Sequence, residues 1–149
     1  MRAAGHGLKV CFIQFIKGSW RYGELDAIKR FDGLIDLHVM GQGFTWKSND
    51  REEDIRLARE AWTFAGTVID SGEYHTVVLD EFTYLLHYNM VEIVPCLQVL
   101  TNRNPSQHVV ITGRYAPQEL ISAADLVTEM QAIKHPLKSG VKAQKGLDF

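Results

Sequence analysis

The feature that most constrains this chain is a short apolar run that ends in two acidic residues. Thr76-Val77-Val78-Leu79 is rich in β-branched side chains and shows no alternation of polar and apolar positions. Such runs are typical of a strand that is buried on both faces, as in the middle of a parallel sheet. Asp80 and Glu81 follow directly. The run therefore predicts a central strand with two carboxylates at its carboxyl end.

Two interpretations of these carboxylates are open at this point. Ligands of open α/β sheets bind outside the carboxyl ends of the strands, and Mg²⁺ beside a phosphate chain prefers hard oxygen ligands. Acidic side chains also favour the first turn of a helix, where they interact with the positive end of the helix dipole. Asp80 and Glu81 can therefore be magnesium ligands or part of a helix start.

Strand and helix patterns alternate along the rest of the chain. The predicted strands are short apolar runs at residues 10–15, 34–40, 76–79, 108–112 and 126–130. The predicted helices have apolar periodicity or a helix-start signal and cover residues 24–31, 50–70, 91–102 and 117–124. Alternation of this kind predicts an α/β fold, with a mostly parallel sheet that carries helices on both faces. The length of 149 residues predicts one domain.

Basic residues follow two of the predicted strands. Lys17-Gly18 comes after the first strand, and Gly113-Arg114 comes after the strand at residues 108–112. Parallel strands place their carboxyl ends at one edge of the sheet, so these groups are expected near Asp80 and Glu81. The planar guanidinium of Arg114 is suited to phosphate oxygens, although an exposed or ion-paired arginine is the alternative. Together the four charged residues indicate a site for a nucleotide and Mg²⁺.

A glycine-containing loop carries two large aromatic side chains. The loop reads Gly41-Gln42-Gly43-Phe44-Thr45-Trp46. Aromatic residues in loops either fold back onto the core or cover a flat, partly apolar ligand. The residues by themselves leave both interpretations of Phe44 and Trp46 open.

Bulk properties exclude several classes of protein. A net charge of −2 argues against nonspecific nucleic-acid binding. No apolar run approaches the roughly 20 residues of a membrane span, and the first residues lack the apolar centre of a signal peptide, so we expect a cytoplasmic protein.

Cys11 and Cys96 lie among apolar residues and are predicted to be free and buried. Residues 131–149 form a basic C-terminal tail, either solvated or drawn to an anionic ligand.

Six short motifs, taken in their order and spacing over nearly the whole chain, resemble the ATP:corrinoid adenosyltransferases. The motifs are Gly5-His6-Gly7, Gln14-Phe15-Ile16-Lys17-Gly18, Gly43-Phe44-Thr45-Trp46, Val77-Val78-Leu79-Asp80-Glu81, Ile111-Thr112-Gly113-Arg114 and Val141-Lys142-Ala143-Gln144-Lys145-Gly146. The resemblance implies a RecA-like phosphate-loop fold and a cytoplasmic homodimer. It also implies transfer of the 5′-deoxyadenosyl group of ATP to Co(I) of a corrinoid, with release of triphosphate. A flavodoxin-like or flavin reductant is the implied electron donor.

The resemblance also implies roles for particular residues. Glu81 is expected to coordinate Mg²⁺ with Asp80 beside it. Lys17 and Arg114 are expected to contact ATP phosphates. Phe44 and Trp46, in the loop described above, are expected to lie against the lower face of the corrin ring. On this basis the two loop aromatics are assigned to a ligand and not to the core.

One part of the family pattern has no counterpart in these residues. The family begins with a strand and a Gly-x-x-x-x-Gly-Lys-Thr phosphate loop, and the resemblance starts only at the helix that follows. We therefore expect an N-terminally truncated sheet with one unpaired neighbour, weak ATP binding and little turnover. A non-catalytic corrinoid-binding module is the alternative. Whether the gap reflects a truncated chain, a part of a longer chain or a short paralogue is open.

Overall fold

The sheet has four strands, and all neighbouring strands are parallel. The structure, a computed structural model, describes residues 1–18, 23–31, 33–41 and 50–146. The strands are β1 (Val10–Gln14), β2 (Ile35–Val39), β3 (Thr76–Asp80) and β4 (His108–Ile111). Their order across the sheet is β2-β1-β3-β4. The predicted α/β fold with a parallel sheet is therefore confirmed, and the central position of β1 and β3 agrees with their apolar sequences.

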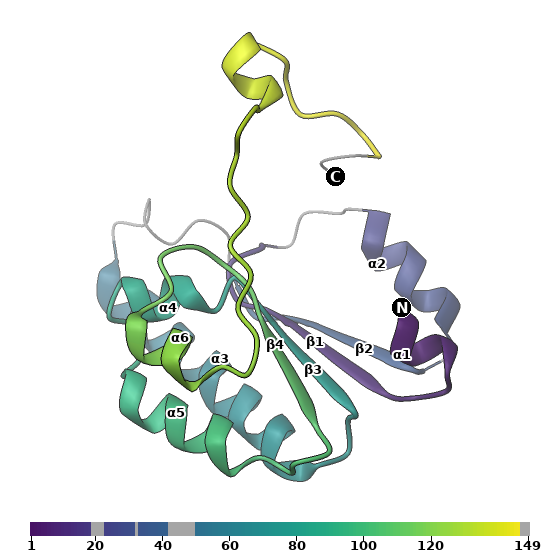
Figure 1. The fold of residues 1–149 in the computed structure, drawn as a ribbon, viewed down its shortest axis with the longest axis vertical. Helices are drawn as coiled ribbons and strands as arrows, with labels where there is room; N and C mark the ends of the chain where they lie inside the picture. Colours follow the sequence, from purple (N-terminus) through teal and green to yellow (C-terminus); the bar gives the residue numbers. More distant parts are fainter. Residues whose placement is uncertain (19–22, 32, 42–49, 147–149) are drawn as a thin grey trace.

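Helices lie on both sides of this sheet. They are α1 (Arg2–Gly5), α2 (Gly23–Ile28), α3 (Arg51–Ser71), α4 (Thr83–His87), α5 (Ile93–Asn102) and α6 (Gln118–Ala123), with 3₁₀ turns η1 (Lys29–Phe31) and η3 (Pro136–Ser139). Figure 1 shows α3, α4, α5 and α6 on one side, and the short α1 and α2 on the other. None of the described helices has both the length and the apolar character to cross a membrane.

The long helix α3 has clear start and stop signals. The side chain of Asp50 caps its first turn by accepting a hydrogen bond from the backbone N–H of Glu53 at 3.1 Å. Acidic residues fill the first turn, where the helix dipole favours them. Gly72 ends the helix in the left-handed conformation with φ of 65°. The chain can therefore turn directly into β3.

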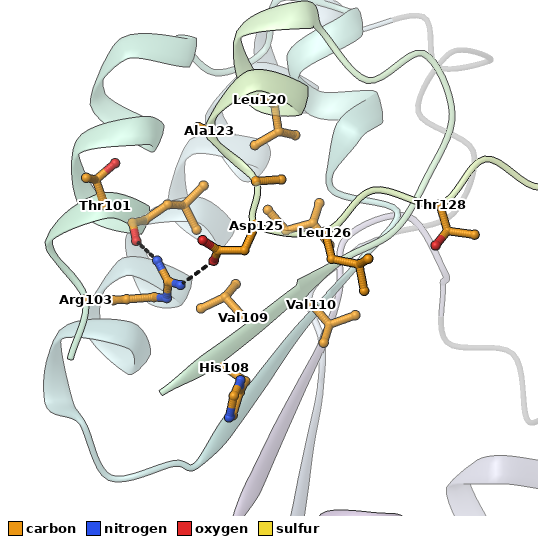
Figure 2. Close-up of a pocket in the computed structure, with 13 residues that line it drawn as sticks. Thr101, Arg103, His108, Val109, Val110, Leu120, Ala123, Asp125, Leu126 and Thr128 are labelled. Carbon is orange, nitrogen blue, oxygen red and sulfur yellow. Dashed lines mark hydrogen bonds and ion pairs between the residues drawn. The ribbon is translucent and has the colours of Figure 1, made fainter. Parts of the chain in front are cut away.

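The prediction of a strand at residues 126–130 was wrong. These residues follow α6 as irregular chain, and Leu126 and Met130 are 85% and 93% exposed. A strand needs a neighbouring edge for its backbone hydrogen bonds, but a groove separates this segment from β4 (Figure 2). Local β-propensity alone does not make a strand here, and residues 131–146 continue as exposed chain.

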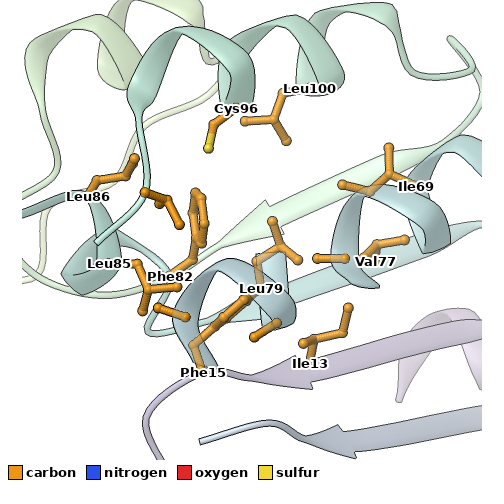
Figure 3. Packing of buried hydrophobic residues seen from close by; sticks show 14 of the residues in the cluster. Ile13, Phe15, Ile69, Val77, Leu79, Phe82, Leu85, Leu86, Cys96 and Leu100 are labelled. Atoms are coloured by element: carbon orange, nitrogen blue, oxygen red, sulfur yellow. The ribbon is translucent and has the colours of Figure 1, made fainter. Parts of the chain in front are cut away.

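The core lies between the sheet and the helices of the α3 side. Cys11, Ile13, Val77 and Leu79 project from β1 and β3 and are fully buried. Phe82, at the start of α4, packs among them (Figure 3), and its ring stacks on that of Trp62 with centroids 4.8 Å apart. This core fixes β3, and with it the position of the two carboxylates that follow.

Both cysteines belong to this core. Cys11 and Cys96 are free and buried, as predicted. The pKa of each thiol is raised to about 12, by burial in both cases and, for Cys11, also by the negative charge of Asp36. Because the thiolate is the reactive form, neither cysteine is suited to nucleophilic chemistry.

Truncation of Leu79 should be strongly destabilising. We expect Leu79→Ala to lower the free energy of unfolding by about 2–5 kcal/mol, because it leaves a cavity in a fully buried site. Val110→Ala on β4 is a suitable control, since Val110 is 46% exposed and should cost less than about 1 kcal/mol. Urea denaturation measures both values, and equal losses would contradict the core described above.

Candidate functional site

The carboxyl ends of β1, β3 and β4 meet around Asp80. In the register of the sheet, Gln14 of β1 lies opposite Asp80 of β3. The Gln14 Nε2 donates a hydrogen bond to Asp80 Oδ2 at 3.4 Å, and the Thr112 Oγ1 donates to Asp80 Oδ1 at 2.9 Å. Both carboxylate oxygens thus have a protein partner. Asp80 is a fixed anion whose orientation is set by the two neighbouring strands.

Glu81 is held in an unusual backbone conformation directly after β3. Its φ is 63°, in the left-handed region that residues with a side chain rarely adopt. The backbone N–H of Glu81 donates to Thr112 Oγ1 at 3.0 Å, so the same hydroxyl connects both acidic residues. Backbone outliers of this kind cost about 1–3 kcal/mol and cluster at functional sites. The outlier identifies Glu81 as a candidate functional residue.

The side chain of Glu81 has an unsatisfied oxygen. Its Oε2 is buried and has no hydrogen-bond partner in the part of the chain that the structure describes. Burial is the main cause that raises the pKa of Glu81, followed by the negative charge of Asp80. The positive charges of Arg114 and Lys17 act in the opposite direction. Two carboxylates and two cations therefore act on one another at this edge.

Lys17 and Arg114 differ in how they are held. The Lys17 Nζ forms an ion pair with Glu24 Oε1 at 2.8 Å, and both side chains are about half exposed. The backbone C=O of Arg114 accepts a hydrogen bond from Thr83 Oγ1 at 2.7 Å. The turn at Arg114 is therefore attached to the start of α4, whereas Lys17 belongs to a solvent-exposed pair.

Gly113 allows the chain to approach α4 closely. Its φ is 137°, and a Cβ added there would lie 2.1 Å from Thr83 Oγ1. Any larger residue would displace the turn that carries Arg114. Glycine is thus required both by the backbone angle and by the space available.

An aromatic cluster lies beside Arg114. The ring of Tyr115 stacks on His87 with centroids 4.5 Å apart, and it meets Tyr84 edge-on at 6.2 Å. Tyr84 in turn stacks on Tyr88 at 6.1 Å. Tyr115 also has a positive φ of 58°, so its position is fixed by the same strained turn. The cluster gives the sheet edge an aromatic border on the α4 side.

The two acidic residues fit Mg²⁺ that is bound together with phosphates. The described residues contain no group of three or more His, Cys, Asp or Glu side chains that could hold a metal ion by themselves. Mg²⁺ is commonly held by one or two carboxylates, waters and substrate phosphates. Glu81 Oε2 is a buried oxygen that lacks a partner among the described residues, and Asp80 adds a second negative charge beside it. The donor set suits this mode of binding.

The sequence predicted part of this arrangement and missed part of it. Asp80, Glu81 and Arg114 lie at the same sheet edge, and Lys17 is close enough to influence Glu81. Phe44 and Trp46 lie outside the described residues. The roles of Gln14 and Thr112 in holding Asp80 were not predicted. One signal in the sequence was Gln14, a polar residue at the end of an otherwise apolar strand. The other was Thr112, which directly follows β4 and lies level with Asp80 in the register of the sheet.

The sequence of this chain is similar to those of one family of known proteins. A sequence model described as ATP:corrinoid adenosyltransferase BtuR/CobO/CobP matches residues 1–149. A Pseudomonas aeruginosa corrinoid adenosyltransferase is 45% identical over 148 residues, which are 99% of this chain and 73% of that protein. Relatives of the same name from Sinorhizobium sp and Escherichia coli K12 are 41% and 38% identical, over 99% of this chain and 70% and 74% of their own lengths.

Proposed function

This chain belongs to the ATP:corrinoid adenosyltransferase family, and we propose that the sheet edge around Glu81 serves the transfer reaction. The 5′-deoxyadenosyl group of ATP is transferred to Co(I) of a corrinoid, in adenosylcobalamin biosynthesis or salvage. The observation that carries this proposal is the buried Oε2 of Glu81, which has no hydrogen-bond partner in the described part of the chain. It lies beside Asp80, and the charges of Arg114 and Lys17 act on it.

The reaction sets two tasks for the protein. Co(I) of the corrinoid attacks C5′ of ATP, a Co–C bond forms, and the C5′–O bond breaks with its electron pair leaving on the triphosphate. The protein must hold cobalt and C5′ in line, and it must stabilise negative charge on the leaving group. The cobalt itself supplies the difficult chemistry.

The charged residues of the site are suited to the second task. Glu81, with Asp80 beside it, would hold Mg²⁺, which when bound supplies positive charge to the triphosphate oxygens. Gln14 and Thr112 keep the Asp80 carboxylate in one orientation. We assign Arg114 to a phosphate oxygen, because its turn is fixed to α4 by Thr83. Lys17 would contact phosphate after it separates from Glu24.

The first task is assigned to the aromatic loop. We propose that Phe44 and Trp46 lie against the lower face of the corrin ring and exclude water and a lower axial ligand. This favours four-coordinate Co(I), the nucleophilic form, and makes the preceding reduction easier. The assignment rests on the motif at residues 43–46, and these residues lie outside the described part of the chain.

Further properties are proposed from the family alone. We propose a RecA-like fold class, a homodimer, a flavodoxin-like or flavin electron donor and a cytoplasmic location. Residues 1–149 contain no Gly-x-x-x-x-Gly-Lys-Thr loop. We therefore propose that these 149 residues by themselves bind ATP weakly and turn over slowly.

Substitution of Arg114 tests the proposed function. In single-turnover assays with chemically reduced corrinoid, Mg²⁺ and ATP, Arg114→Ala should lower the rate by about 10- to 100-fold, because the leaving group loses a cation. Arg56→Ala is the control, since Arg56 pairs with Glu53 and Glu60 on the exposed face of α3. It should leave the rate within about twofold.

Two results would contradict the proposal. One is an unchanged rate in Arg114→Ala. The other is corrinoid binding by the unaltered chain with no ATP-dependent product under any condition, which would support the non-catalytic corrinoid-binding module. Product formation that responds to Arg114 but not to Arg56 would support the transferase.

A further inference from the structure

Thr112 is an exposed residue whose hydroxyl bonds to both acidic residues of the candidate site. It directly follows β4, and its backbone N–H donates to the Leu79 carbonyl of β3 at 3.1 Å. Its Oγ1 donates to Asp80 Oδ1 at 2.9 Å and accepts from the backbone N–H of Glu81 at 3.0 Å. A hydroxyl has one proton to donate, and an ionised carboxylate only accepts, so the two bonds are compatible. One side chain thus holds two consecutive acidic residues of a neighbouring strand end.

Three contacts fix the backbone of Glu81 at its left-handed φ of 63°. The next residue, Phe82, is fully buried in the core. The backbone C=O of Glu81 accepts a hydrogen bond from the N–H of Tyr84 at 3.2 Å, at the start of α4. The third contact is the bond from the Glu81 N–H to Thr112 Oγ1. The first two contacts belong to the segment that contains Glu81, whereas the third comes from a different strand.

The direction of the Glu81 side chain depends on this third contact. Without the Thr112 hydroxyl, the N–H of Glu81 loses its acceptor, and the residue can return to a more ordinary φ. Such a rotation moves Cβ and redirects the side chain that carries the buried Oε2, the oxygen without a hydrogen-bond partner among the described residues. The arrangement of the two carboxylates therefore depends on one hydroxyl.

Fold stability alone does not account for the bonds of Thr112. The end of β4 is already held to β3 by the backbone N–H of Thr112, and the residue itself is exposed. Its hydroxyl instead maintains a backbone conformation at Glu81 that costs free energy, and strain of this kind is found mainly at functional sites. The other hydrogen bond to Asp80, from Gln14, is longer at 3.4 Å. Thr112 is thus the closer partner of that carboxylate.

We propose that Thr112 is a positioning residue for the Mg²⁺ site, and that its hydroxyl holds Glu81 in the left-handed conformation in which the side chain binds the ion. The inference rests on the proposed function, because it assigns these hydrogen bonds to metal binding. Thr112 acts through Glu81 and does not itself contact the ion or the nucleotide. Serine carries the same hydroxyl and should replace threonine, whereas valine has a similar shape and no hydroxyl.

Hydrogen exchange in the metal-free protein tests the effect on the backbone. Thr112→Val should speed exchange of the Glu81 amide at least about tenfold, because the amide loses its acceptor. Thr112→Ser should leave that rate within about twofold. The amide of Leu79, which is fully buried in β3, is the internal reference and should exchange at the same rate in all three proteins.

Isothermal titration calorimetry of ATP with and without Mg²⁺ tests the effect on metal binding. The measured quantity is the factor by which Mg²⁺ lowers the Kd for ATP. Thr112→Val should reduce this factor about tenfold, as expected when a metal ligand loses the partner that orients it, and Thr112→Ser should restore it. The Kd without Mg²⁺ should stay within about twofold. Leu100→Ala, at a buried site of α5, should destabilise the fold and leave the factor unchanged.

A double variant shows whether Thr112 acts through Glu81. In a Glu81→Gln background, Thr112→Val should reduce the Mg²⁺ factor no further. The inference is overturned if Thr112→Val leaves the Glu81 amide protected, if it leaves the factor unchanged, or if it lowers the factor equally in both backgrounds. If Mg²⁺ does not tighten ATP binding even in the unaltered chain, the proposed function fails and this inference fails with it. A response to Mg²⁺ that is equal in the unaltered chain and in Thr112→Val overturns the inference alone.

Discussion

Replacing Glu81 by Gln should stabilise the fold and at the same time weaken the binding of ATP with Mg²⁺. The carboxylate is partly buried, its Oε2 lacks a partner in the described structure, and Asp80 adds a like charge. The amide removes the charge at almost constant size. We expect a gain of about 1 kcal/mol near pH 7, at the low end for an unpaired buried group because Glu81 keeps some contact with water.

The stabilisation should depend on pH in a defined direction. The pKa of Glu81 is raised in the folded state, so folding favours the protonated form. The contribution of Glu81 to the free energy of unfolding is therefore favourable below the ordinary pKa of glutamate, and it is lost as the pH rises through the raised pKa. Glu81→Gln should therefore differ little from the unaltered protein at about pH 4, and its advantage should grow towards neutral pH. Urea denaturation in metal-free buffer at both pH values measures this change.

Glu81→Gln should weaken ligand binding although it stabilises the fold. Loss of the charged oxygen should weaken the Mg²⁺-dependent part of ATP binding at least about tenfold, or about 1.4 kcal/mol, as measured by isothermal titration calorimetry. Glu119→Gln, at an exposed carboxylate of α6, should change neither stability by more than about 0.5 kcal/mol nor the response to Mg²⁺. The prediction is contradicted if the Glu81→Gln variant is less stable than the unaltered protein and its ATP binding depends on Mg²⁺ to the same extent. Glu81 would then have a structural role.

The sequence predicted those features of the site that depend on one segment at a time. The apolar run before Asp80 indicated a buried strand, and the positions of Glu81 and Arg114 after two strands placed them at one edge of a parallel sheet. The partners of Asp80 depend instead on the register of three strands. A pattern with a period of two residues does not determine which residue of β1 lies opposite Asp80, so Gln14 was missed.

The prediction for residues 126–130 failed for a different reason. The local sequence pattern is typical of a strand, but the position of the segment in the fold does not allow strand pairing. Leu126-Val127-Thr128 has good β-propensity, yet the segment faces a groove where a strand would need a partner. Strand formation depends on tertiary pairing more than helix formation does. The same dependence explains why α3, which has its own cap and apolar face, was predicted well.

Replacing Gly113 by Ala should give the largest loss of stability among single substitutions at the site. The new methyl group would lie 2.1 Å from Thr83 Oγ1, and alanine would have to adopt a φ of 137°. We expect a loss of at least about 3 kcal/mol, together with reduced ATP binding because the turn at Arg114 must move. Gly66→Ala in α3 is the control, since no described atom beyond its chain neighbours and its own helix backbone lies within 4 Å of its Cβ position. It should be neutral or stabilising by up to about 1 kcal/mol.

A double substitution separates the two causes of this loss. Thr83→Ala alone should cost about 1 kcal/mol, because it removes the hydrogen bond to the Arg114 carbonyl. Combined with Gly113→Ala, it removes the atom that the new methyl group would overlap, so the double variant should be more stable than the sum of the two losses predicts. The remaining deficit measures the strain at φ of 137° together with the contact that the new methyl group still makes with Cβ of residue 83, 3.2 Å away. Strict additivity would show that the close contact with Thr83 does not determine the need for glycine, and that the backbone angle alone does.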